Sequence, residues 1–159
     1  MTGAELQALE DNIACVTLNR PRRLNAIDGS LIDAMDDVLD VLGAGEFRAA
    51  ILTGAGRGFC AGADLSGTAE PWTKPAKPAA AESPSFKTNY DAQVRLADQY
   101  TRLYELPIPV IAAVNGVAVG GGLASRCIAT SGSRLNKPGS VFIKAGFSSI
   151  SAPRGDRRL

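Results

Sequence analysis

The chain has 159 residues, of which 45% are hydrophobic and 21% charged, and its formal net charge is +1. This composition is that of one soluble globular domain with a modest core, and so small a net charge attracts the chain to neither nucleic acid nor a membrane. The sequence contains no histidine, so catalytic triads, general bases and metal sites that depend on a histidine are excluded.

The cysteine spacing and the apolar runs bear on the compartment in which the protein is expected, and the charged residues are unevenly distributed along the chain. Cys15, Cys60 and Cys127 are odd in number and widely spaced, so free thiols are expected rather than a zinc site or a disulfide framework. No apolar run has transmembrane length and the N-terminus lacks a signal-peptide core, so we expect a cytoplasmic protein. Asp156 is the only acid after Glu105, so the C-terminal third is basic.

The first elements alternate between strand and helix. Residues 14–19 are expected to form a strand, and the polar residues before them can pair with it as a hairpin. A loop follows over residues 20–26 because Pro21 breaks regular structure. A helix is expected over residues 31–42, with Asp28 or Ser30 as its N-cap.

A second strand-helix-strand unit follows. Residues 49–53 are expected to form a strand, and residues 67–86 a proline-rich excursion that is either a mobile lid or a plain loop. A helix is predicted over residues 91–105, before a strand over residues 109–114. This order predicts right-handed β-α-β units and a largely parallel sheet, hence an α/β fold.

Two turns of small residues each follow a predicted buried strand. The first spans residues 58–65 (GFCAGADL) and the second spans residues 115–123 (NGVAVGGGL), after which the sequence supports only a short helix. Small residues leave backbone N–H groups uncovered, so a ligand oxygen can approach them closely. Two such groups aimed at one point would form an oxyanion hole.

The chain resembles the crotonase family, that is, the enoyl-CoA hydratases, isomerases and their relatives. Four segments carry the resemblance: TLNRP with LNA in residues 17–26, ILTG with RGFCAGADL in residues 51–65, LPIPVIAAVNG through GGGL in residues 106–123, and VFIKAGF in residues 141–147. The resemblance implies a spiral of ββα units, incomplete at the C-terminus. We accordingly expect a crotonase-like core over residues 1–147 and an irregular basic tail over residues 148–159.

The resemblance also implies a site for an acyl-CoA thioester. Its carbonyl oxygen would accept hydrogen bonds from the backbone amides of Ala63 and Gly121. Arg20, Arg22 and Arg23 are candidates for contacts with the CoA phosphates, although an exposed basic loop is an equally good interpretation. The remaining positions that match the family's substrate-contacting segments are Leu24, Ala26, Ala61, Asp64 and Leu65. Asp64 is typical of the family motif, and its structural alternative is to cap a following helix.

The sequence departs from the hydratase pattern at two positions. Ala124 and Phe142 stand where hydratases of the family carry two glutamates, and neither side chain transfers a proton. Asp156 and Glu70 are weak substitutes. One hypothesis is therefore an enoyl-CoA hydratase- or isomerase-like protein of fatty acid metabolism, and another is a non-catalytic acyl-CoA-binding or truncated pseudo-enzyme fragment. CoA is expected as part of the substrate, without a tightly bound cofactor or metal, and the family implies a homotrimer.

Overall fold

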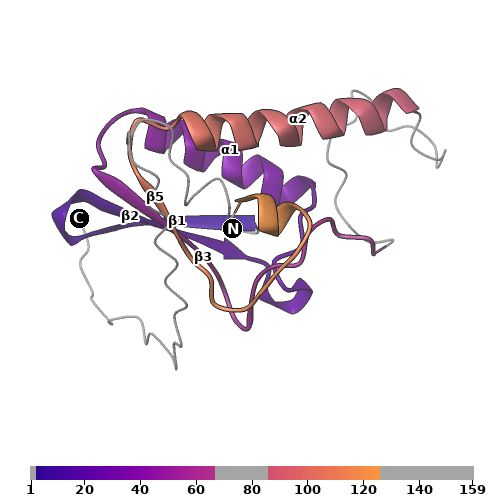
Figure 1. Ribbon diagram of the computed structural model, residues 1–159, viewed down its shortest axis with the longest axis horizontal. Coiled ribbons are helices and arrows are strands. Elements are labelled where there is room, and N and C mark those ends of the chain that lie inside the picture. The colour runs from indigo at the N-terminus through magenta and orange to yellow at the C-terminus, as the bar shows by residue number, and fades with distance from the viewer. Residues whose placement is uncertain (1–2, 67–85, 126–159) are drawn as a thin grey trace.

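The computed structural model describes residues 3–66 and 86–125 (Figure 1). It begins with a hairpin of β1 (Gly3–Leu9) and β2 (Ile13–Asn19), which pair antiparallel from Gly3 opposite Asn19 to Leu9 opposite Ile13. Asp11 and Asn12 form the turn with φ values of 58° and 55°. Asp and Asn tolerate this left-handed region better than most residues. The predicted hairpin is confirmed.

The main sheet has four strands in the order β1-β2-β3-β5. β3 (Ala49–Gly54) and β5 (Val110–Ala113) both run parallel to β2, so the sheet is parallel apart from its first strand. Along β2 and β3 buried and half-buried residues alternate, because successive side chains point to opposite faces. The expected parallel arrangement is confirmed.

Two helices cover one face of this sheet (Figure 1). α1 (Gly29–Gly43) has Asp28 as its N-cap, whose Oδ1 accepts from the Leu31 amide at 3.0 Å, so Asp28 rather than Ser30 fills that position. α2 (Phe86–Glu105) begins five residues earlier than its apolar pattern predicted. No helix within the described residues has the length and apolar character needed to cross a membrane.

The core lies between the helices and the sheet. It joins apolar side chains of α1, such as Ile32 and Leu42, to Val16 of β2, Leu52 of β3 and Leu103 of α2. Burying large apolar side chains in this layer is the main stabilisation that the fold obtains. The cluster as a whole comprises Ala4, Ala14, Val16, Leu18, Ile27, Leu31, Ile32, Val38, Leu39, Leu42, Ala50, Leu52, Phe59, Cys60, Leu103, Leu106, Val110 and Ala112.

Polar contacts fix α2 against α1. Arg95 pairs with Asp33 and Asp36 of α1, each at 2.6 Å. The buried Gln99 donates to the Ile32 carbonyl at 2.6 Å and to Asp36 Oδ1 at 2.7 Å. These contacts determine which side of α2 faces the sheet, and they therefore position Tyr100, the residue after Gln99.

A second, two-stranded sheet stands beside the first. β4 (Gly58–Cys60) and β6 (Val117–Ala118) pair in parallel, with Gly58 opposite Val117 and Cys60 opposite Ala118. Both strands belong to the segments read from sequence as turns of small residues. The pairing places the first residues of the first turn beside the first half of the second.

Several sequence predictions fall outside the described residues. These are the proline-rich excursion predicted over residues 67–86, except for its last residue in α2, the strand segment over residues 141–147 and the basic tail over residues 148–159. The expected core over residues 1–147 is described only as far as residue 125.

Candidate functional site

The two small-residue turns approach each other at Gly62 and Gly120. Both glycines have positive φ, 82° and 53°, a conformation that side chains disfavour. A Cβ added at Gly62 would lie 3.0 Å from the Val119 carbonyl oxygen and 3.5 Å from Gly120 Cα. The Val119 amide also donates to the Cys60 carbonyl at 3.1 Å. The two backbones are therefore in direct contact, which larger residues would prevent.

The amides of Ala63 and Gly121 flank this contact. The backbone hydrogen bonds next to Ala63 are formed by the residues on either side of it. The Ile27 amide donates to the Gly62 carbonyl at 2.7 Å, and the Asp64 amide donates to the Ile27 carbonyl at 2.8 Å. Gly121 is the first residue of a helical segment described over residues 121–125, where the amides have no acceptor within the helix. Within the described residues, no backbone carbonyl accepts from either amide.

Two asparagines hold the turns in place. Asn25 is fully buried and donates to the carbonyls of Ala55 at 3.0 Å and Gly58 at 2.8 Å. Asn115 donates to the carbonyls of Gly54 at 2.6 Å and Gly56 at 2.9 Å. Both side chains satisfy backbone groups that the irregular segments cannot pair among themselves. In the sequence both asparagines stand within the motifs that carry the family resemblance, and residue spacing alone assigns them no role.

Arg20 lies in a nearly buried ion cluster. Its Nη2 is 2.8 Å from Asp28 Oδ2 and 2.9 Å from Asp64 Oδ2, and the two carboxylate side chains are only 2% and 4% exposed. The Ser66 hydroxyl, and after it the Ser66 amide and Arg20, lower the pKa of Asp64 to about 2. Arg20 is thus occupied inside the fold, which corrects its candidacy for phosphate contacts.

Asp64 has this structural role, and residues 61–66 are not helical. Its Oδ1 accepts from the Ser66 amide at 3.0 Å and from the Ser66 hydroxyl at 2.7 Å, which closes a local turn. The predicted helix cap is therefore wrong within the described residues. The side chain joins the turn to Arg20 on the loop after β2.

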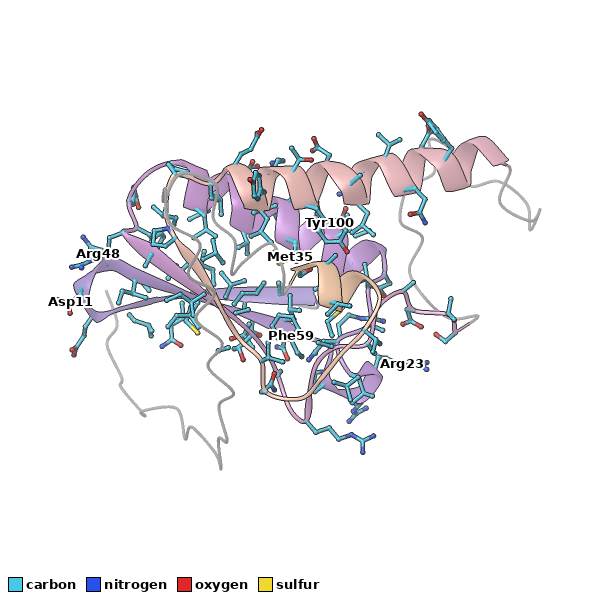
Figure 2. All side chains as sticks on the ribbon, viewed as in Figure 1. Asp11, Arg23, Met35, Arg48, Phe59 and Tyr100 are labelled. Atoms are coloured by element: carbon cyan, nitrogen blue, oxygen red, sulfur yellow. The ribbon has the colours of Figure 1, made fainter. Side chains whose placement is uncertain are left out.

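The other residues predicted to contact the acyl-CoA differ in how exposed they are. Arg22 and Arg23 lie exposed on a single 3-10 turn (Pro21–Arg23), and Figure 2 shows Arg23 at the edge of the molecule. Leu65 is 94% exposed. Ala26 is buried, whereas Leu24 and Ala61 are half-buried and joined by a hydrogen bond from the Ala61 amide to the Leu24 carbonyl at 3.0 Å.

A cavity of about 40 Å³ is lined by residues of α1, α2 and the main sheet, together with Ile27, Cys60 and Ser125. Its wall is largely apolar, and its polar members are Cys60, Gln99, Tyr100 and Ser125. Burial raises the pKa of the Cys60 thiol, which therefore stays protonated. The apolar lining residues are Leu18, Ile27, Leu31, Ile32, Met35, Leu39, Leu52, Leu96 and Leu103.

Tyr100 is the member of this wall that sequence reasoning missed. It projects from α2 on the side of Met35 in Figure 2, and a Cβ added at Gly121 would lie 2.4 Å from its Oη and 2.5 Å from Ile27 Cδ1. The helical pattern assigned Tyr100 only to an apolar face. Its hydroxyl was the available signal, because a buried phenol ordinarily requires a hydrogen-bond partner.

The described residues show which groups are available at the site for proton transfer or metal binding. Ala124, the position of the first expected glutamate, is half-buried in the helical segment, whereas Phe142 lies outside the described residues. No group of three or more Cys, Asp or Glu side chains suited to a metal ion occurs in residues 3–66 and 86–125. The polar side chains that line the cavity are an amide, two hydroxyls and a protonated thiol.

Curated relatives match the same segments. A 1,2-epoxyphenylacetyl-CoA isomerase of Escherichia coli is 40% identical over 118 residues, which cover 74% of this chain and 42% of the relative. A short-chain-enoyl-CoA hydratase of Clostridium acetobutylicum is 40% identical over 136 residues, covering 81% and 47%. The chain thus spans less than half the length of these relatives.

Solved structures show the same arrangement. An enoyl-CoA hydratase from Bacillus anthracis matches with a TM-score of 0.65 and 29% identity, over 80% of this chain and 45% of that one. A Pseudomonas aeruginosa protein matches with a TM-score of 0.64 and 35% identity, over 80% and 50%. The sequence profile of the enoyl-CoA hydratase/isomerase family matches residues 8–130. The chain therefore belongs to the enoyl-CoA hydratase/isomerase family and has its α/β crotonase fold over the matched region.

Proposed function

We propose that this chain binds acyl-CoA thioesters, with the thioester oxygen held by the backbone amides of Ala63 and Gly121. The observation that carries the proposal is the contact between the two turns, which brings together two amides that no described carbonyl accepts from. Amides fixed in advance stabilise negative charge on a carbonyl oxygen without reorganisation. An acyl-CoA ligand accords with the hydratase and isomerase named among the relatives.

Two exposed arginines, Arg22 and Arg23, are the proposed contacts for the CoA part of the ligand. Arg22 and Arg23 precede Leu24, whose carbonyl is bonded to the first small-residue turn through Ala61. CoA carries several phosphate oxygens, which guanidinium groups bind well. We assign these two arginines to the CoA moiety and the apolar cavity to the acyl group.

The proposed activity is binding rather than hydration. Adding water across a conjugated thioester requires groups that take and deliver protons at the pH of the reaction. Ala124 supplies none at the position where the family resemblance places one, and burial keeps the Cys60 thiol protonated. Among the described residues that line the cavity, no carboxylate is present to act on a polarised thioester.

Two variants at Gly121 test the role of its amide. Gly121→Pro removes the N–H, and proline is well tolerated at the first position of a helix. Gly121→Ala keeps the N–H but introduces the same Cβ beside Tyr100 and Ile27. The Cβ is common to both variants, so their difference reports the loss of the N–H together with the two further ring carbons of proline.

Calorimetric titration with crotonyl-CoA and with free CoA provides the measurement. We expect crotonyl-CoA to bind more tightly than CoA, and the proline variant to bind it about three- to tenfold more weakly than the alanine variant. Free CoA should not distinguish the two variants. Equal affinities of both variants for crotonyl-CoA would refute the oxyanion role. Loss of the conjugated-thioester absorbance on incubation would instead show that the chain is catalytic.

A further inference from the structure

The Tyr100 hydroxyl is buried in the cavity wall, where the neighbouring Ser125 hydroxyl forms no hydrogen bond of normal geometry with it. Its Oη is the one side-chain polar atom in residues 3–66 and 86–125 that is fully shielded and forms no hydrogen bond. A phenol can donate and accept, and shielding it from water without a partner is unfavourable. An unsatisfied group of this kind beside a cavity indicates a partner beyond the described residues, and a ligand in the cavity would be such a partner.

The other polar groups of the cavity already have partners. Gln99 donates to the Ile32 carbonyl and to Asp36, so its amide is held toward α1. Ser125 donates to the Gly121 carbonyl at 3.0 Å, as helical serines commonly do. The Gly62 backbone is hydrogen-bonded to Cys60. Among the described residues of the wall, Tyr100 is therefore the donor left for a ligand.

The position of this donor relates it to the proposed thioester site. Tyr100 Oη lies 2.4 Å from the point that a Cβ at Gly121 would occupy, so it adjoins one of the two proposed carbonyl-binding residues. The cavity of about 40 Å³ has room for roughly three water-sized groups. An acyl chain entering from the thioester carbonyl would place its first few atoms within reach of the phenol.

We propose that Tyr100 determines acyl specificity by donating a hydrogen bond to an oxygen carried on the short acyl chain of a bound CoA thioester. The inference rests on the proposed function and adds the chemical class of the acyl group. Burial, reinforced by the Cys60 thiol and partly offset by the Ser125 hydroxyl, raises the pKa of Tyr100 to about 12. The phenol is therefore a neutral donor at physiological pH, suited to a hydroxyl or carbonyl oxygen.

The test compares ligands that differ by one oxygen. Butyryl-CoA, 3-hydroxybutyryl-CoA and 4-hydroxybutyryl-CoA are titrated calorimetrically into the full chain and into Tyr100→Phe. Tyr90→Phe is the matched control, since it makes the same change on α2 at an exposed side chain. We expect at least one hydroxylated ligand to bind the wild type about three- to tenfold more tightly than butyryl-CoA. Tyr100→Phe should lose this preference and Tyr90→Phe should keep it.

The outcomes separate this inference from the proposed function. Tight binding of all three ligands without a preference in the wild type would overturn the role of Tyr100 and leave acyl-CoA binding intact. A preference that persists in Tyr100→Phe would do the same, and would show that another group recognises the oxygen. Failure of every ligand to bind the folded wild type would overturn both proposals. If Tyr100→Phe does not fold, the absence of a preference in the wild type still overturns the role of Tyr100.

Discussion

Replacing Arg20 by methionine is expected to destabilise the protein strongly at neutral pH. Methionine retains much of the apolar stem but leaves Asp28 and Asp64 without their shared cation, and both carboxylates are almost completely shielded from water. Removing one partner of a buried ion pair costs about 3–5 kcal/mol, because the remaining charge is left uncompensated. This is a large part of the roughly 5–15 kcal/mol that stabilises an ordinary domain.

The pH dependence of this loss follows from Asp64. Its folded-state pKa of about 2 lies below the unfolded value of roughly 3.9, so its contribution to stability is complete above about pH 4 and is lost as the pH falls toward 2. In the variant Arg20 no longer lowers this pKa, so the native state binds a proton at higher pH than the wild type does. The stability difference should therefore shrink on acidification. The convergence will be partial, because Ser66 is the largest cause of the lowered pKa.

Urea unfolding followed by circular dichroism at pH 7, 4 and 2.5 measures the effect. Arg22→Met is the matched control, since Arg22 is exposed on the adjacent turn and should change the free energy of unfolding by less than about 0.5 kcal/mol. The combination of Arg20→Met with Asp28→Asn and Asp64→Asn should recover part of the loss. An Arg20→Met protein as stable as Arg22→Met at pH 7, or a difference that grows on acidification, would refute the reasoning.

Two further predictions concern the core and the cavity. Phe59 is 0% exposed, so Phe59→Ala should lower the free energy of unfolding by about 3–5 kcal/mol and Phe59→Leu by clearly less, as measured by urea unfolding; equal losses would contradict close packing there. The pKa of Tyr100, about 12, exceeds the usual tyrosine value of about 10, so the unfolded state releases its proton first. Stability should therefore fall from about pH 10 to 12, and Tyr100→Phe should show a shallower decline, whereas identical slopes would argue against a buried phenol.

The local sequence determined the elements and the two turns. Short apolar segments predicted β2 and β3, and the apolar spacing before Gly43 predicted α1. These signals depend on neighbours within a few residues, so they can be read without the fold. The starting point of α2 was missed because residues 86–90 have no clear apolar periodicity and follow a proline-rich stretch.

The tertiary structure alone decided which partners the polar residues take. Arg20 was read beside Arg22 and Arg23 as a phosphate contact, yet it meets Asp64, 44 residues later, because the bridge between Ile27 and Ala63 brings their segments together. Tyr100 was read as part of an apolar helix face, yet packing against α1 places its hydroxyl beside Gly121. Such contacts depend on how distant elements pack, which residue spacing along the chain does not encode. The sequence alone predicted the two turns of small residues. Only the tertiary structure showed that the Tyr100 hydroxyl lines the cavity next to Gly121.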